Sequence, residues 1–189
     1  MKRYDSYKPS GISWIGDIPS QWSLRRIKHI FSERKDKSIT GTEIALSLTK
    51  DKGLIPSSEK INKTLESESL VGCKKISAGE IVFNRFRARL FALASVDGVV
   101  SPDYAVYRAS DVCKPYIVTL LNTDIYRDAF NRKASGIGDG FSRLYTDDLF
   151  AFYVPYPPLA EQERIVTFLS TKTSCIDAQQ RERERVTAA

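Results

Sequence analysis

The segment from Leu159 to Ala189 contains neither glycine nor proline, and it directly follows Pro157-Pro158. Proline ends any regular element that precedes it but is tolerated in the first turn of a helix. Glu161 and Glu163 would lie in that first turn, where the helix dipole favours negative charge, and arginines follow near the other end. The pattern predicts one helix of roughly 28 residues, about 42 Å long.

The predicted helix has an apolar face in its first half and a charged second half. Apolar residues that recur at steps of three and four predict a face that packs against something. For the first half, packing on its own domain and packing against a partner helix both stay open. The Arg/Glu-rich second half is expected to project from the domain. The predicted partner interface comprises Leu159, Ile165, Val166, Leu169 and Ile176.

The composition indicates a folded chain with an excess of basic residues. A hydrophobic share of 42% and a charged share of 28% are typical of globular proteins and exclude a disordered chain. No apolar run is long enough to cross a membrane and no secretory signal is visible, so we expect a cytoplasmic protein. Three widely spaced cysteines indicate buried thiols, and a single histidine excludes a His-rich metal site. The net charge of +6 is a modest indication of a polyanionic partner.

Apolar patterns ahead of the helix predict an α+β fold. Alternating or continuous apolar runs predict strands at 44–48, 81–83, 90–96 and 104–108, with Asp97-Gly98 as a hairpin-type turn. Two helical pieces are expected within 112–132, and Thr123 is a candidate N-cap for the second. We therefore expect a mixed-sheet globular domain over residues 1–156, followed by a long coiled-coil-type helix over residues 157–189.

Three segments contain candidate binding residues. Residues 50–69 are polar and predict a long surface loop. Residues 84–89 have arginines at alternate positions, which project from one face if the segment is extended. Residues 136–145 combine three glycines with flanking basic residues. For residues 84–89 the alternative to DNA contacts is a solvated, salt-bridged face, and for the glycine-rich segment it is a flexible turn. DNA contacts stay open because the guanidinium fork of arginine matches phosphate oxygens and guanine edges. The predicted DNA-binding residues are Lys50, Asn84, Arg85, Arg87, Arg89, Arg132, Lys133, Ser135, Gly138, Arg143 and Tyr145.

The sequence contains no convincing catalytic motif. Asp17 with Glu33-Arg34-Lys35 is only a faint match to the acidic elements of metal-dependent nucleases. Pro155-Tyr156-Pro157-Pro158 lacks the Asn or Asp of the amino-methyltransferase signature, and the glycine-rich segment lacks the Gly-Lys-Ser/Thr of a Walker loop. A single histidine leaves no convincing Ser/His/Asp set. We expect a chain that is not an enzyme and that binds no cofactor or metal itself.

Five motifs span nearly the whole chain. They are Gly11-Ile12-Ser13-Trp14-Ile15-Gly16-Asp17-Ile18-Pro19 through Trp22, Gly79-Glu80-Ile81-Val82-Phe83-Asn84-Arg85-Phe86-Arg87-Ala88, Asp97-Gly98-Val99-Val100-Ser101-Pro102-Asp103-Tyr104-Ala105-Val106, Ser135-Gly136-Ile137-Gly138-Asp139-Gly140 with Arg143-Leu144-Tyr145, and Pro157-Pro158-Leu159-Ala160-Glu161-Gln162-Glu163-Arg164-Ile165. Together, and in this order, they resemble the specificity (S) subunit of type I restriction–modification systems, specifically one target recognition domain with its following helix.

The resemblance implies a non-catalytic subunit that reads double-stranded DNA. Such subunits usually contain two recognition domains, each reading one half of a bipartite target. They recruit methyltransferase (M) subunits, which use S-adenosylmethionine, and motor-nuclease restriction (R) subunits, which use ATP and Mg²⁺. Only one domain and one helix are present here, which implies a half-subunit or a fragment. A second recognition half, or a homodimer formed through the helix, would restore the two recognition domains. The alternatives are a protein–protein adaptor with an incidental basic face and a stand-alone nuclease.

Overall fold

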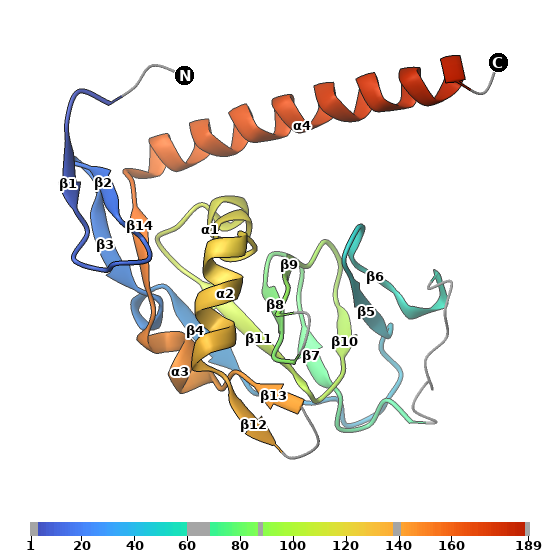
Figure 1. The fold of residues 1–189 in the computed structure, drawn as a ribbon. Helices are drawn as coiled ribbons and strands as arrows, with labels where there is room; N and C mark the ends of the chain where they lie inside the picture. Colours follow the sequence, from blue (N-terminus) through green and yellow to red (C-terminus); the bar gives the residue numbers. More distant parts are fainter. Residues whose placement is uncertain (1–3, 60–68, 87–88, 138–140, 188–189) are drawn as a thin grey trace.

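The computed structural model describes residues 4–59, 69–86, 89–137 and 141–187. Strands and three shorter helices form a globular head, and the long helix α4 (Leu159–Thr187) runs along one side of it (Figure 1). Two predicted binding residues, Arg87 and Gly138, and much of the predicted 50–69 loop lie outside the described residues. In the described part of the chain, no helix is long and apolar enough to cross a membrane.

The head is built from short strands that pair antiparallel. The fold class is therefore α+β, as predicted. The strands are β1 (Tyr7–Pro9), β2 (Asp17–Pro19), β3 (Ser23–Arg26), β4 (Phe31–Arg34), β5 (Leu46–Thr49), β6 (Gly53–Pro56), β7 (Lys74–Ile76), β8 (Ile81–Asn84), β9 (Phe91–Leu93), β10 (Gly98–Val100), β11 (Tyr104–Ala109), β12 (Ser135–Ile137), β13 (Phe141–Arg143) and β14 (Tyr153–Tyr156). The other helices are α1 (Lys114–Leu121), α2 (Asp124–Lys133) and α3 (Thr146–Ala151), with 3-10 turns η1 (Ile27–His29) and η2 (Ser57–Glu59).

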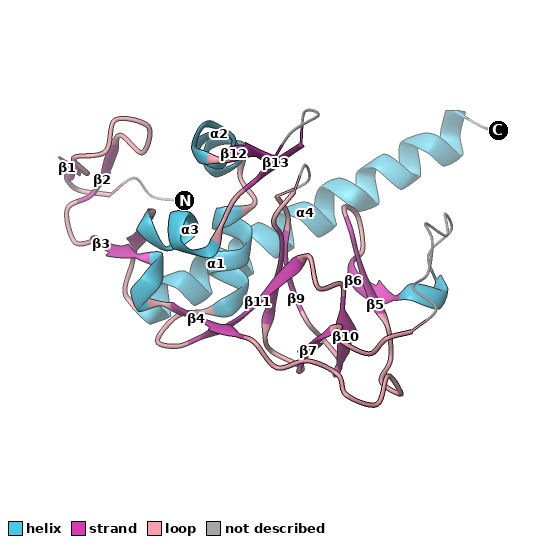
Figure 2. Cartoon of the chain, turned by 90° about the horizontal axis from the view of Figure 1, so that it is seen from below, coloured by secondary structure: helices cyan, strands magenta, loops and turns pink. Residues whose placement is uncertain are grey.

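A four-stranded sheet of order β4-β11-β8-β9 separates two hydrophobic cores. Side chains alternate along a strand, so each strand contributes to both faces. Figure 2 shows α1, α2 and α3 on one side of this sheet and the β5–β6 and β7–β10 pairs on the other. The helix-side core includes Phe31, Ile81, Phe83, Phe91, Tyr107, Ile117, Leu121, Tyr126 and Phe130. The second core includes Leu46, Leu54, Ile76, Val82, Ala92, Val100 and Val106.

The two predicted helical pieces within 112–132 are α1 and α2, and each buries an apolar stripe against the sheet. Phe83 stacks on Phe91 with ring centroids 4.2 Å apart, and Phe130 from α2 packs against both rings. Burying one such aromatic side chain is worth about 1.5–3 kcal/mol. Thr123 lies at the N-cap of α2, but its hydroxyl donates to the Leu120 carbonyl and makes no cap hydrogen bond. The predicted N-cap position is therefore confirmed, although the side chain does not cap the helix with a hydrogen bond.

The path of the chain between β9 and β11 differs from the predicted hairpin. Asp97-Gly98 does not join two neighbouring strands, because β10 leaves the central sheet and pairs with β7. Similarly, residues 53–56 of the predicted long loop form β6 and pair with β5. The sequence pattern identified strands but not their partners. The β7–β10 pair joins strands that are not consecutive in the chain, and the short turn between β5 and β6 lay inside the predicted long loop.

Gly98 allows the backbone of β10 to approach the segment before β5. A Cβ at this position would lie 2.5 Å from the Ile44 carbonyl oxygen and 2.9 Å from two Leu46 side-chain carbons. We expect Gly98→Ala to lower the free energy of unfolding by about 2 kcal/mol through overpacking, measured by urea denaturation. Gly11→Ala is the control, because nothing lies within 4 Å of its added carbon and only the left-handed backbone, φ +76°, is strained. If Gly11→Ala were the more destabilising of the two, steric crowding at Gly98 would be excluded.

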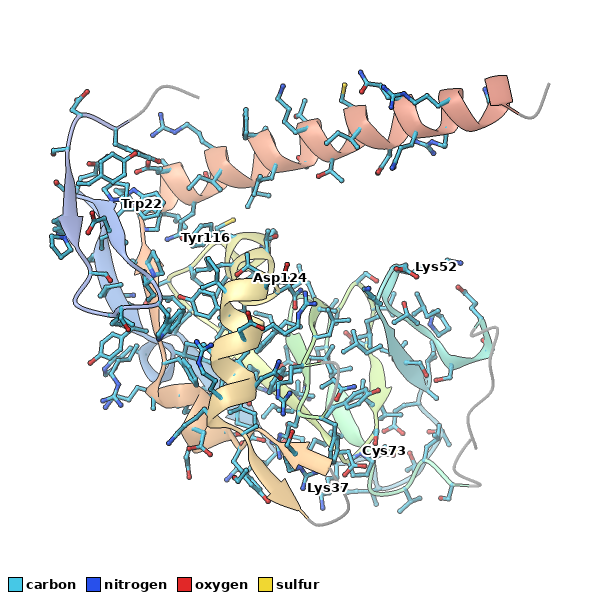
Figure 3. The ribbon with its side chains drawn as sticks, viewed as in Figure 1. Trp22, Lys37, Lys52, Cys73, Tyr116 and Asp124 are labelled. Atoms are coloured by element: carbon cyan, nitrogen blue, oxygen red, sulfur yellow. The ribbon has the colours of Figure 1, made fainter. Side chains whose placement is uncertain are left out.

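The predicted long helix is confirmed as α4, and only its base contacts the head. Gln162 is fully buried there, whereas every residue from Thr167 to Arg181 is exposed. The β3–β14 pair connects the chain start to the strand before α4. Tyr4 donates a 2.5 Å hydrogen bond to Glu161; partial burial, that bond and the carboxylate charge raise the pKa of Tyr4 to about 12. The N-terminal segment therefore braces the base of the helix (Figure 3 labels Trp22 and Tyr116 beneath it).

Candidate nucleic-acid interface

Two of the segments predicted to bind DNA meet at one end of the head. The loop between β8 and β9 contacts the β12–β13 hairpin, because the Leu144 amide donates to the Arg85 carbonyl at 3.0 Å. Arg143 of β13 also lies over the Phe86 ring, 4.7 Å from its centroid. Figure 1 shows the hairpin at the end of the head away from α4. We call Lys74, Arg85, Arg89 and Arg143, which gather here, the basic cluster.

The predicted arginine stripe is not formed. Strand β8 ends at Asn84, whose side-chain oxygen accepts the Phe86 amide and turns the chain. Arg89 has a left-handed backbone with φ of 39°, and its amide donates to the Phe86 carbonyl. Arg85 and Arg89 therefore do not have the extended geometry that would align their side chains. The prediction of one arginine face is wrong for this pair, and Arg87 lies outside the described residues.

Arg85 is held by an acidic partner on the helix side of the sheet. It forms a short ion pair with Glu33 and a 3.2 Å hydrogen bond to the Thr146 hydroxyl. Lys74 lies 3.7 Å from the same Glu33 carboxylate. Burial and the nearby charge of Arg85 lower the pKa of Lys74, which shows that positive charge is concentrated here. One carboxylate thus compensates two cations.

Arg89 stabilises the loop from within. It is only 5% exposed, and it donates to the side chains of Asn131 on α2 and Ser142 on β13. Among the described residues it has no acidic partner, and burial lowers its pKa. A buried guanidinium with neutral partners fixes the relative positions of the elements it joins. Arg89 is therefore a positioning residue and does not present its fork to solvent.

Arg143 is the most exposed member of the basic cluster, and Tyr145 lies beside it. Arg143 donates to Asp103 at 3.0 Å, and its guanidinium lies over the rings of Phe86 and Tyr145, 4.7 and 5.9 Å from their centroids. The Tyr145 side chain is exposed, whereas the Arg143 side chain is 22% exposed. Contact with aromatic rings orients a guanidinium. The four cations of the basic cluster face two carboxylates, Glu33 and Asp103, so the site keeps an excess of positive charge.

Comparison with known proteins shows what this fold is similar to. Residues 99–188 match the model described as the type I restriction modification DNA specificity domain. The HsdS subunit of Thermoanaerobacter tengcongensis superposes with a TM-score of 0.59 at 16% identity, over 93% of this chain and 42% of that one. The type I S subunit of M. genitalium gives 0.56 at 12% identity, over 94% and 42%.

A chain from a type I R-M system, studied for its complex assembly and conformational transition, gives a TM-score of 0.60 at 17% identity. It is matched over 92% of this chain and 43% of its own length. The resemblance to type I specificity subunits is confirmed. The chain spans less than half the length of the solved chains it matches. No curated protein sequence matches the chain.

The remaining predicted DNA-binding residues lie at two places in the head. Arg132 and Lys133 end α2 beside the basic cluster and are exposed, with the Lys133 ammonium 3.4 Å from Asp148. Ser135 pairs with Arg143 across the hairpin. Lys50 is exposed at the β5–β6 turn, in the other half of the head, near Lys52 in Figure 3. The structure therefore gathers all described candidates except Lys50.

Sequence reasoning missed several residues of this site. Phe86 had a visible signal, because it is an aromatic residue between two arginines, a pattern typical of nucleic-acid surfaces. Glu33 and Lys74 had no such signal in the sequence. Glu33 contacts Arg85 and Lys74 only because strands that are distant in sequence pack together. Glu33 was considered only as part of a faint nuclease motif with Asp17. Its carboxylate is engaged by Arg85, and Asp17 pairs with Pro9 in the β1–β2 hairpin.

Proposed function

We propose that this specificity domain reads one half of a bipartite DNA target for a type I restriction–modification enzyme. The observation that supports this most directly is the convergence of the β8–β9 loop and the β12–β13 hairpin on one basic cluster. Arginine is favoured wherever phosphate oxygens and guanine edges are recognised. The match to the specificity-domain family over residues 99–188 supports the same function.

In this proposal the basic residues have two roles. Arg85 and Arg89 position the two loops through Glu33, Asn131 and Ser142. Arg143, Tyr145, Arg132 and Lys133 contact the duplex: the cations neutralise phosphates, and the stacked Arg143 with Tyr145 reaches base edges. Positions Arg87 and Gly138 stay predicted contacts. Phosphate contacts fix orientation on the duplex, whereas base contacts specify sequence.

The exposed helix α4 supports the second part of the proposal, which is assembly with partner subunits. Phe168, Leu169 and Ile176 are large apolar side chains exposed on it. We propose that the predicted face of α4 docks M and R subunits or a second recognition half. The S-adenosylmethionine, ATP and Mg²⁺ chemistry then belongs to those subunits. In this proposal the chain itself is non-catalytic and acts in the cytoplasm.

A double substitution at the end of α2 tests DNA recognition. We expect Arg132→Ala with Lys133→Ala to weaken binding to a mixed-sequence duplex about ten-fold at low salt. Two lost phosphate contacts should also flatten the salt slope by about 1.8, since each contributes about 0.9. Fluorescence anisotropy between about 50 and 200 mM salt measures both quantities. The control is Lys8→Ala with Lys172→Ala, two exposed cations on β1 and α4, whose affinity and slope should not change.

The protein–protein adaptor remains the second candidate function. One observation favours it: Arg85 already has an acidic partner and Arg89 is buried, so neither is a free cation on the surface. In that case no duplex is retained at any salt concentration, and the double substitution at Arg132 and Lys133 has nothing to change. Binding of a partner through α4 alone would then be the function of the chain.

A further inference from the structure

A polar pocket lies on the opposite face of the central sheet from the Glu33–Arg85 pair. Its volume is about 440 Å³, and it is open to solvent. Arg34 and Arg108 enter it from neighbouring strands β4 and β11, and Lys114 enters from the start of α1. Glu80, just before β8, is the one carboxylate that lines it. The pocket thus combines three cations with one anion.

Glu80 orients the two arginines of this pocket. Its carboxylate accepts from Arg34 at 2.8 Å, from Arg108 at 2.9 Å and from the Ser77 amide at 2.8 Å. Burial alone would raise the pKa of Glu80, but these hydrogen bonds outweigh it and hold the pKa below its usual value. Glu80 is therefore a permanent anion that fixes the guanidinium groups at neutral pH. Asp36 forms an ion pair with the Nε of Arg34 at 2.9 Å.

Arg108 and Lys114 keep donors available for a ligand. Arg108 lines the pocket and binds Glu80 through Nε, and its side chain is 61% exposed, so its two terminal nitrogens are not needed for the bond to Glu80. Lys114 has no ion-pair partner among the described residues. Its ammonium lies against the Gly79 turn, 3.2 Å from where a Cβ would sit. A fork with one fixed nitrogen and a neighbouring ammonium match a carboxylate in geometry and charge.

The pocket is separate from the basic cluster and close to the base of α4. Glu80 precedes β8 and Arg85 follows it, and five residues of extended chain correspond to about 16 Å. Lys114 directly follows Cys113, whose amide donates to Gln162 of α4 at 3.0 Å. A protein bound along the start of α4 therefore lies near this pocket, whereas DNA held at the basic cluster lies at the opposite end of the strands.

We propose that this pocket binds a carboxylate side chain from an acidic segment of a protein that also contacts the base of α4. Arg108 and Lys114 hold the carboxylate, while Arg34 and Glu80 hold Arg108 in place. The position beside α4 favours a protein carboxylate over a DNA phosphate. This inference does not depend on DNA recognition by the basic cluster, and the two are tested by different substitutions.

The test uses a hexaglutamate peptide and a duplex of about 20 base pairs as separate probes of the isotopically labelled chain. We expect hexaglutamate to shift the amide resonances of Ala78, Gly79 and Lys114 in a saturable way. Arg108→Ala with Lys114→Ala should weaken this binding at least ten-fold. The folded state should survive, because both side chains are partly exposed and Glu80 keeps its bond to Arg34. Amide resonances outside the pocket should match those of the unsubstituted chain, and this comparison checks that the variant is folded.

The matched control is the double substitution at Arg132 and Lys133, which should leave hexaglutamate binding unchanged. Conversely, the Arg108 and Lys114 double variant should bind the duplex as the unsubstituted chain does. If hexaglutamate leaves the three amides unshifted, or binds the double variant equally well, the proposal is wrong. If the duplex shifts these amides and the double variant loses duplex affinity, the pocket binds DNA phosphate and the protein-carboxylate assignment is overturned.

Discussion

Replacing Glu33 by alanine is expected to lower the free energy of unfolding by about 3–5 kcal/mol. Both side chains of the Glu33–Arg85 pair are largely buried, and Lys74 lies within 4 Å of the same carboxylate. Without Glu33, Lys74, whose pKa is already lowered by burial and by the charge of Arg85, would face that arginine in a poorly hydrated site with no carboxylate between them. Urea denaturation followed by circular dichroism measures the loss, and higher salt should reduce it by screening the repulsion.

Asp36→Ala is the control for this substitution. Asp36 is also bonded to an arginine, but its side chain is 60% exposed and Arg34 retains Glu80 after the change. An exposed ion pair contributes about 0–1 kcal/mol, so the control should unfold nearly as the unsubstituted chain does. Equal losses for the two variants would mean that Glu33 does not compensate a buried charge. The basic cluster would then need no internal anion to stay folded.

The role of Glu33 also explains why part of the basic cluster cannot serve as a free anion-binding surface. A buried carboxylate keeps Arg85 pointing into the head, where it supports the carbonyl that accepts the Leu144 amide. The position of the β12–β13 hairpin therefore depends on the ion pair between Arg85 and Glu33 of β4. Loops that read DNA are effective only if a rigid scaffold positions them. Glu33 is part of that scaffold.

Sequence reasoning succeeded where the physical cause is local. The absence of glycine and proline after Pro158, with acidic residues in the first turn, was sufficient to predict α4. The second helical piece predicted within 112–132 is likewise confirmed as α2, and Tyr126 and Phe130, four residues apart, are both buried on it. Helix hydrogen bonds and helix faces involve residues three and four apart, so these features are visible in any short window.

It failed at one local turn and wherever the outcome depends on contacts between distant residues. Alternation predicted that Arg85 and Arg89 share a face, but the Asn84 side chain accepts the Phe86 amide and turns the backbone immediately after β8. The candidate segments were each found from composition, yet nothing in the sequence indicated that residues 84–89 and 136–145 touch. Nor did any pattern indicate the Arg108 pocket, whose charged residues come from four separate segments. Pairing of distant strands is specified by the whole core and not by a local pattern.

The second large loss of stability is expected when Gln162 is replaced. The contacts of this side chain explain why a glutamine follows Glu161 at the start of α4. Its side-chain oxygen accepts the Cys113 amide at 3.0 Å, and its amide nitrogen donates to the Pro157 carbonyl at 2.9 Å. One fully buried side chain thus bonds the beginning of α1, the segment before α4 and α4 itself. A glutamine provides both a donor and an acceptor, which an alanine, leucine or ionised glutamate does not.

Gln162→Ala is expected to leave two buried backbone groups without partners, at about 1–3 kcal/mol each, and so to cost about 4 kcal/mol in unfolding free energy. Urea denaturation measures the total, and hydrogen exchange of the Cys113 amide reports the local loss, since its protection should fall first. Gln179→Ala on the exposed half of α4 is the matched control and should change stability by less than about 0.5 kcal/mol. If the Cys113 amide stays protected in the Gln162 variant, the base of α4 is held by its apolar contacts and by Tyr4, and the helix would keep its direction from the head without this glutamine.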